Sequence, residues 1–129
     1  NMGYDELKTT LTKFNEHLNK GGIVVFDTFF TKKGWKEGLF GVKKFSTPNL
    51  DIARVFKSTS KNNVGRTEQT YIIYENGKKK ILEDVNVIYL FEEDKIKKLM
   101  EKSGFKTRVY YDFSENKKGY TCVFVGVKE

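Results

Sequence analysis

The stretch Gly21-Gly22-Ile23-Val24-Val25-Phe26-Asp27 is the part of the sequence that most directly indicates the fold. Its four middle residues form a short apolar run, which is the pattern of a strand buried on both faces of a parallel sheet. Before it, residues 5–19 carry apolar side chains at helical spacing, and Asp5 suits the N-terminus of that helix. A helix, a glycine turn and a buried strand make half of a βαβ unit, so we expect an α/β fold.

The middle of the chain has a different pattern. Its residues alternate between polar and apolar and are rich in β-branched side chains, which predicts strands at 41–46, 52–59, 66–75 and 79–91. Asn76-Gly77 separates the last two runs, and both residues tolerate the positive φ angles of a type I′ hairpin turn. We therefore expect an antiparallel sheet with one packed face and one solvated face.

The last third of the chain returns to the earlier pattern. Residues 92–103 predict a helix with acidic residues in its first turn and lysines further along, and two strands follow at 106–113 and 119–127. The predicted organisation is a partial α/β core formed by residues 1–39 and 92–129. Residues 40–91 form an antiparallel sheet inserted into that core.

The composition limits the class of protein. A chain of 129 residues with 38% hydrophobic residues is the size of one domain and can bury a core. Cys122 is the only cysteine, so no internal disulfide forms, and its apolar strand predicts a buried, unreactive thiol. No apolar run approaches the about 20 residues needed to cross a bilayer. We expect a cytoplasmic protein without a membrane partner.

The chain is basic, with 24 lysines and arginines against 17 acidic residues and a net charge of +7. The excess is mostly lysine and is spread over turns and helix faces. Two interpretations remain open: a solvated surface, or attraction to an anion such as a nucleotide or nucleic acid. The scattered arrangement favours the first. One histidine, His17, and one cysteine do not suffice for a zinc site, so we expect no metal.

Two segments carry a resemblance to a known family. Leu18-Asn19-Lys20-Gly21-Gly22 with the apolar strand after it, and Leu90-Phe91 followed by a helix and Ser103-Gly104-Phe105, resemble the C-terminal half of class I S-adenosylmethionine-dependent methyltransferases. The resemblance implies the corresponding half of a Rossmann-like sheet, α+β in this shortened form, with the antiparallel sheet inserted as a cap.

The inserted sheet narrows the resemblance. The segments 53–58, 66–68, 84–91 and 124–127 are similar to sugar N,N-dimethyltransferases of macrolide biosynthesis. In that family the insertion helps to cover a site for a nucleotide-linked amino sugar. The resemblance therefore implies the acceptor-binding part of an enzyme that methylates the amine of a small substrate.

The resemblance also sets an expectation about the cofactor. The family holds S-adenosylmethionine with a glycine-rich turn after its first strand and an acid at the end of its second. Neither G-x-G-x-x-G nor D-x-G-x-G occurs in this sequence, and Gly21-Gly22 precedes a strand. We expect that this chain alone binds no cofactor, is inactive, and needs the missing N-terminal half as its partner.

Five positions are candidates for contact with the acceptor. Asp27 and Thr28 follow the carboxyl end of a strand, where open α/β sheets bind ligands, although they also suit a packed loop. Arg54, Ser58 and Arg66 align with polar positions of the family's insertion. Arg54 and Ser58 share one strand face, and Arg54 with Arg66 would hold a diphosphate. The alternative for Arg66 is an exposed cross-strand pair with Glu68 or Glu83.

The catalytic residue is not identified by the sequence. Tyr4 lies near the place where the family has an Ile-Gly-His motif, but the sequence there is Met2-Gly3-Tyr4, which makes Tyr4 a weak candidate.

Other partners follow from charge and from strand edges. By the resemblance, the strand at 23–26 would be flanked on both sides, but the sequence lacks its usual neighbour, the family's fourth strand. An unpaired edge of this kind predicts pairing with a second copy of the chain. The alternative function is a basic, β-rich binding module for nucleic acid or another anion.

Overall fold

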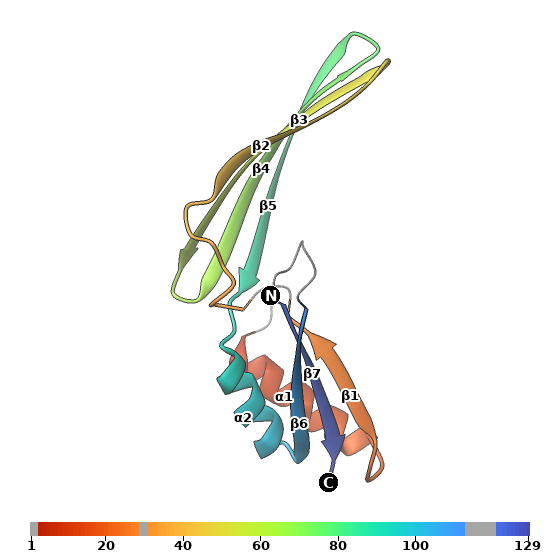
Figure 1. The fold of residues 1–129 in the computed structure, drawn as a ribbon, viewed down its shortest axis with the longest axis vertical. Helices are drawn as coiled ribbons and strands as arrows, with labels where there is room; N and C mark the ends of the chain where they lie inside the picture. Colours follow the sequence, from red (N-terminus) through yellow and green to blue (C-terminus); the bar gives the residue numbers. More distant parts are fainter. Residues whose placement is uncertain (1–2, 29–30, 113–120) are drawn as a thin grey trace. The chain divides into compact units, whose positions relative to one another are not determined.

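The computed structural model describes residues 3–28, 31–112 and 121–129. The chain divides into two compact units (Figure 1). The core unit comprises Asn1–Trp35 and Tyr89–Glu129, and the inserted unit comprises Lys36–Ile88. The sequence had placed the inserted sheet at residues 40–91.

The core unit combines two helices with a three-stranded sheet. Its elements are α1 (Tyr4–His17), β1 (Ile23–Asp27), α2 (Glu93–Lys102), β6 (Phe105–Asp112) and β7 (Thr121–Lys128). The strand order is β1-β7-β6, and β7 pairs antiparallel with both neighbours. Since β1 and β6 both run opposite to β7, they run parallel to each other, and their carboxyl ends lie at the same end of the sheet.

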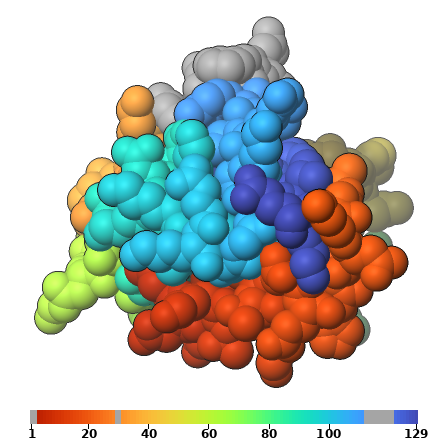
Figure 2. Space-filling view, turned by 90° about the horizontal axis from the view of Figure 1, so that it is seen from below, coloured from red at the N-terminus to blue at the C-terminus, as the bar shows by residue number. Residues whose placement is uncertain are grey.

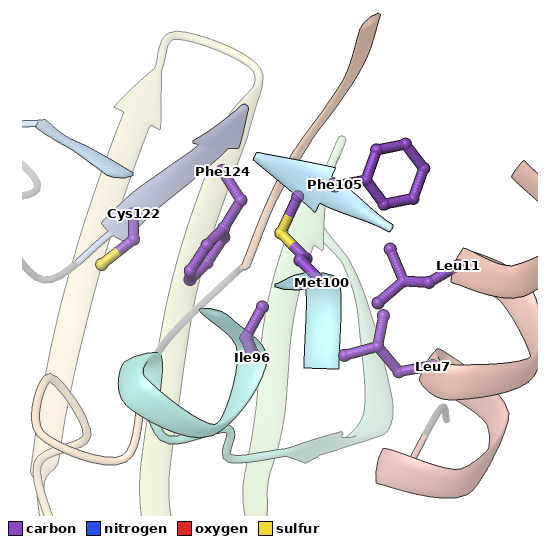
Figure 3. Close-up of a cluster of buried hydrophobic side chains, with 7 residues drawn as sticks. All are labelled: Leu7, Leu11, Ile96, Met100, Phe105, Cys122 and Phe124. Carbon is purple, nitrogen blue, oxygen red and sulfur yellow. The ribbon is translucent and has the colours of Figure 1, made fainter. Parts of the chain in front are cut away.

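The hydrophobic core lies where α1 and α2 pack on one face of this sheet. Each helix contributes side chains four residues apart, which places them on one helix face. The buried cluster comprises Leu7, Leu11, Ile96, Met100, Phe105, Cys122 and Phe124. Figure 3 shows these side chains gathered between the helices and the strands. In the space-filling view, α1 lies directly against α2, and β1 lies beside the end of β7 (Figure 2).

The helix ends differ slightly from the expectation. Gly3, not Asp5, is the N-cap of α1, and its N–H donates to the Glu6 carboxylate at 2.9 Å. That contact satisfies one of the amides that a helix start leaves without a partner. Neither helix in the described residues has the length and apolar character needed to cross a bilayer.

The prediction that residues 23–26 are buried on both faces was wrong for the described chain. Val24 and Phe26 pack on the core, but Ile23 and Val25 are each 60% exposed on the opposite face. The strand that pairs with β1 here is antiparallel. A continuous apolar run shows that both faces suit burial, but it does not show which layers are present to cover them.

The inserted unit is a four-stranded antiparallel sheet in the order β2-β3-β4-β5. Its strands are β2 (Phe40–Thr47), β3 (Leu50–Lys61), β4 (Val64–Glu75) and β5 (Lys78–Tyr89), which confirms the four predicted strands. Asn76 and Gly77 have φ angles of 49° and 76°, as a type I′ turn requires. Asn62 and Asn63, with φ angles of 51° and 64°, connect β3 to β4 in the same way.

The expected division into a packed face and a solvated face was wrong for this sheet. The described residues of the inserted unit include no helix or second sheet, and large apolar side chains are exposed along it. Phe40 is 67% exposed and Phe45 58%, and these two side chains lie on opposite faces of β2. The alternation of polar and apolar residues in the sequence follows the pleat of the strands, which turns successive side chains to opposite faces. It does not show that a second layer covers one face, and the described residues of this unit provide none.

Candidate functional site

A row of polar side chains crosses the core sheet where β1 and β6 end. In the register, Tyr111 stands opposite Cys122, and the Thr28 N–H donates to the Cys122 carbonyl at 3.3 Å. Thr28 therefore continues β1 beside Cys122. Because side chains alternate along a strand, Thr28, Cys122 and Tyr111 lie on the face that packs against the helices. Figure 3 shows Cys122 at this end of the core, beyond Phe124.

The first residue of α2 brings a carboxylate onto this row. Glu93 accepts a hydrogen bond from the Tyr111 hydroxyl through Oε1, and the Cys122 Sγ lies 3.8 Å from Oε2. Two donors from neighbouring strands thus meet one carboxylate from a helix. We call Thr28, Glu93, Tyr111 and Cys122 the Glu93 row.

The Glu93 carboxylate raises the pKa of its two neighbours, Tyr111 and Cys122. Its hydrogen bond, with burial and its charge, raises the pKa of Tyr111 to about 12. Burial, followed by the charge and hydrogen bond of Glu93, raises the pKa of the Cys122 thiol to about 11. Both groups are therefore neutral at physiological pH, and the Cys122 thiol is buried as predicted.

The two predicted residues at the end of β1 differ in their surroundings. Thr28 is 7% exposed, and its hydroxyl has no hydrogen-bond partner in the described structure. Asp27 stands opposite Val123 on the other face of the sheet, and it is exposed. Only Thr28 belongs to the Glu93 row, so the structure separates two residues that the sequence treated together.

Tyr4 fastens the start of α1 to the segment that leads into α2. Its hydroxyl accepts the Glu92 N–H at 2.8 Å, and its ring meets those of Tyr89 and Phe91 edge-on at 5.4 Å and 5.1 Å. Burial raises the pKa of Tyr4. A phenol in this environment stays protonated near neutral pH, so the geometry shows a structural contact and gives Tyr4 no support as a base.

Arg54 lies on a cationic row of the inserted sheet. The register places it between Lys43 on β2 and Tyr71 on β4. Its guanidinium carbon lies 4.8 Å above the centre of the Phe56 ring, and its Nε is buried without a hydrogen-bond partner in the described structure. The acidic residues Asp51 and Glu68 of β3 and β4 lie on the opposite face of the sheet.

Gly41 leaves room for the Phe56 ring, which lies under the Arg54 guanidinium. Gly41 stands opposite Phe56, and a Cβ at Gly41 would lie only 2.5 Å from the Phe56 Cζ. The absence of a side chain lets the ring lie across β2, where it forms the surface under the guanidinium. Ser58, 7% exposed, lies on the same face, as the even spacing predicted. We call Lys43, Arg54, Phe56, Ser58 and Tyr71 the Arg54 face.

Arg66 does not join this group. It stands opposite Thr59, and the alternation of β3 and β4 places it on the face away from Arg54. It forms an exposed ion pair with Glu68 at 2.9 Å, two residues along the same strand. The two arginines therefore do not share one face of the sheet. The pair with Glu68 is exposed as expected, but it lies along one strand and is not the cross-strand pair that the sequence suggested.

The sequence analysis missed Glu93 and Tyr111. In the sequence, Glu93 is one of the acidic residues in the first turn of the predicted helix, and Tyr111 lies within a predicted strand. The sequence does place Glu93 at the start of the second helix, Tyr111 near the end of one strand and Cys122 near the start of the next, so all three could lie at one end of the sheet. Finding their contact required the register of β6 and β7, which the sequence does not supply.

The glycine pair before β1 is not available to a cofactor. The Gly21 N–H donates to the Lys128 carbonyl at 2.9 Å, and the Gly22 carbonyl accepts the Lys128 N–H at 2.9 Å. These groups bind β7, so they do not fit the role of a cofactor-binding turn. Within the described ranges, no group of three or more His, Cys, Asp or Glu side chains is arranged to hold a metal ion.

Comparison with known proteins confirms the resemblance drawn from the sequence. The chain is 26% identical over 124 residues, 95% of its length, to dTDP-3-amino-3,4,6-trideoxy-alpha-D-glucopyranose N,N-dimethyltransferase from Streptomyces venezuelae. That match covers 51% of the relative, so the chain spans about half the length of the curated protein that it matches. No family model matches the chain.

Solved structures show the same fold. An amino pentose methyltransferase of calicheamicin biosynthesis from Micromonospora echinaspora, solved with S-adenosylmethionine bound, matches with a TM-score of 0.85 and 17% identity over 100% of this chain and 53% of its own. A sugar N-methyltransferase from a Streptoalloteichus species matches with a TM-score of 0.77 and 20% identity over 97% of this chain and 49% of its own. The mixed α/β fold is thus that of half a methyltransferase of this kind, consistent with the C-terminal part.

Proposed function

We propose that this chain is the acceptor-binding portion of an S-adenosylmethionine-dependent methyltransferase that methylates the amine of a small, nucleotide-linked sugar. The observation that carries the proposal is the match along 95% of the chain to a dimethyltransferase named for a dTDP-linked amino sugar. The structural neighbours support the fold, and two of them are described as an amino pentose methyltransferase and a sugar N-methyltransferase.

The Arg54 face supplies the chemistry that a nucleotide diphosphate needs. Arg54 and Lys43 are opposite each other on adjacent strands, and the Arg54 Nε is buried without a hydrogen-bond partner in the described structure. A guanidinium with unused N–H groups forms charge-assisted hydrogen bonds to phosphate oxygens. Ser58 and Tyr71 add hydroxyl groups on the same face. We assign the diphosphate of the acceptor to this face.

The test is calorimetric titration of the 129-residue chain with dTDP, comparing two arginine variants. Arg54→Gln is expected to weaken binding at least about tenfold, the loss of one charge-assisted contact. Arg66→Gln removes the same charge from the opposite face, so it is the matched control and is expected to change binding by less than about threefold. Equal effects of the two variants would contradict the assignment.

Catalysis by the chain alone is not expected. Incubation with labelled S-adenosylmethionine and an amino sugar is expected to give no methylated product, because the chain offers no cofactor-binding turn. Methyl transfer by the isolated chain would overturn this part of the proposal.

The alternative of a basic module for nucleic acid remains a prediction with its own test. It requires oligonucleotide binding that weakens steeply with salt, because such binding releases counterions from the phosphates.

A further inference from the structure

We propose that the Glu93 row is a subsite for an ammonium group, with Glu93 as the counter-ion and the Thr28 hydroxyl as a second hydrogen-bond partner. The choice of an amine ligand rests on the proposed function, while the site itself is argued from geometry within the core unit. Neither Glu93 nor Tyr111 was a candidate before the structure placed them together.

The position of the row suits a ligand. Thr28, Cys122 and Tyr111 come from three adjacent strands, at the end of the sheet where β1 and β6 reach their carboxyl ends. Ligands of open α/β sheets bind just outside such ends. Glu93 is the first residue of α2, so the helix and the sheet both direct polar groups to one place.

The hydrogen-bonding capacity of the row is not used up. A carboxylate offers about four lone-pair positions. Tyr111 occupies one on Oε1, and the Cys122 thiol, a weak donor, approaches Oε2 at 3.8 Å. Acceptor capacity therefore remains on Glu93.

Thr28 is the second and independent observation. Thr28 is only 7% exposed, so it is more than nine-tenths buried, and its hydroxyl has no hydrogen-bond partner in the described structure. A buried hydroxyl without a hydrogen bond costs free energy, which a ligand that bonds to it recovers. Thr28 lies on the same face and the same row as Cys122, whose thiol lies 3.8 Å from the Glu93 carboxylate.

The charge of the surroundings selects a cation. The Tyr111 hydroxyl already donates to Glu93, so an anionic ligand would meet the negative charge of the carboxylate. Asp94, the next residue of α2, adds a negative charge near Tyr111. On the other side of the helix start, Lys95 is paired with Glu92 at 2.5 Å. An ammonium group donates up to three hydrogen bonds and carries the complementary charge.

A purely structural reading makes a different prediction. If Glu93 only anchors α2 to β6 and β7, its replacement lowers stability but leaves the binding of amines and neutral sugars alike. If the row is a subsite, the chain distinguishes an amine from its neutral analogues, and the distinction depends on Glu93.

The experiment follows amide resonances of the ¹⁵N-labelled 129-residue chain during titration with D-glucosamine. The control ligands are D-glucose, which has no amine, and N-acetyl-D-glucosamine, whose nitrogen is uncharged. At about pH 6 an amine is protonated, since α-amines have pKa values near 8. We expect saturable shifts at Thr28, Glu93 and Cys122 with glucosamine, and none that saturate with the two neutral sugars.

Three variants complete the test. Glu93→Gln is expected to weaken glucosamine binding at least about tenfold, as the loss of a charged partner implies. Glu101→Gln removes a carboxylate from the last turn of the same helix and is expected to leave binding unchanged. Tyr111→Phe keeps the Glu93 charge and frees one of its lone pairs, so binding is expected to be as tight or tighter.

The results that overturn the proposal are equal shifts for all three sugars, no saturable shift, or wild-type affinity of Glu93→Gln. Should Glu93→Gln fail to fold, Tyr111→Phe decides, because a tenfold loss there contradicts a site centred on the carboxylate. Glucosamine carries no nucleotide, so this result is independent of dTDP binding by the Arg54 face. Failure of one does not imply failure of the other.

Discussion

Cys122 is 2% exposed in β7, and its thiol lies 3.8 Å from a carboxylate oxygen of Glu93. Burial disfavours a thiolate here, and the negative charge of Glu93 disfavours it further, so the pKa rises to about 11. Replacing Glu93 by Gln removes the charge and leaves the burial. The pKa of Cys122 is therefore expected to fall, while remaining above its ordinary value.

Alkylation by iodoacetamide at about pH 8 measures this shift, because the thiolate is the nucleophile. Each pKa unit lost raises the thiolate fraction about tenfold at that pH, so Glu93→Gln is expected to react faster than the wild type. Glu101→Gln provides the control with an unchanged rate. A Glu93→Gln rate equal to that of the wild type would show that the carboxylate does not act on the thiol.

At the level of single residues, the sequence predicted features that depend on one strand, such as which side chains share a face. It did not predict contacts that depend on the register between two strands or on helix packing. The shared face of Arg54 and Ser58 and the burial of Cys122 follow from alternation and apolar neighbours, and both are confirmed. The separation of Arg54 from Arg66 depends on the register between β3 and β4. The contact of Glu93 with Tyr111 depends on how a helix packs on a hairpin, which no local pattern specifies.

At the level of elements, Gly41 determines how Phe56 lies on the inserted sheet. A methyl group at Gly41 would be 2.5 Å from Phe56, so Gly41→Ala forces the ring away from its place under Arg54. Overpacking of this kind costs about 1–3 kcal/mol. We expect Gly41→Ala to lower the free energy of unfolding by that order and to weaken dTDP binding.

Urea unfolding and the dTDP titration measure the two effects of Gly41→Ala separately. Ser46→Ala is the matched control, since Ser46 is exposed on the same strand and lies on the face away from Arg54. Wild-type stability together with wild-type dTDP binding in Gly41→Ala would refute the role given to the glycine.

The elements themselves were largely predictable, and their layers were not. Asn76-Gly77 has a backbone requirement that few residue pairs meet, so the hairpin between β4 and β5 was predicted from two residues. The apolar residues 23–26 correctly predicted a strand. One face of that strand is exposed, so an apolar sequence alone does not show which faces other elements cover. The same reasoning explains why alternation in the inserted strands wrongly suggested one packed face.

At the level of the whole molecule, each unit leaves apolar surface uncovered within the described residues. The chain spans about half of its relatives, and β1 is the terminal strand of its sheet, with Ile23 and Val25 exposed. A terminal strand presents backbone N–H and C=O groups without partners, which favours pairing with another strand. The sequence pointed to this situation, because the two motif segments resemble half of a larger sheet.

We therefore expect the isolated chain to self-associate through β1. Sedimentation velocity over a range of concentrations is expected to show a reversible shift from monomer towards dimer. Val25→Lys places a charge on the exposed face of the terminal strand, which natural sheets use to prevent such pairing. This variant is expected to stay monomeric while it keeps the wild-type fold, because Val25 is 60% exposed and takes no part in the core.

Lys106→Val controls for a change of surface charge on β6, at the other edge of the same sheet, and is expected to leave the dimer unaffected. A wild-type chain that sediments as a monomer at every concentration would refute pairing through β1, and a Val25→Lys variant that still dimerises would place the interface elsewhere.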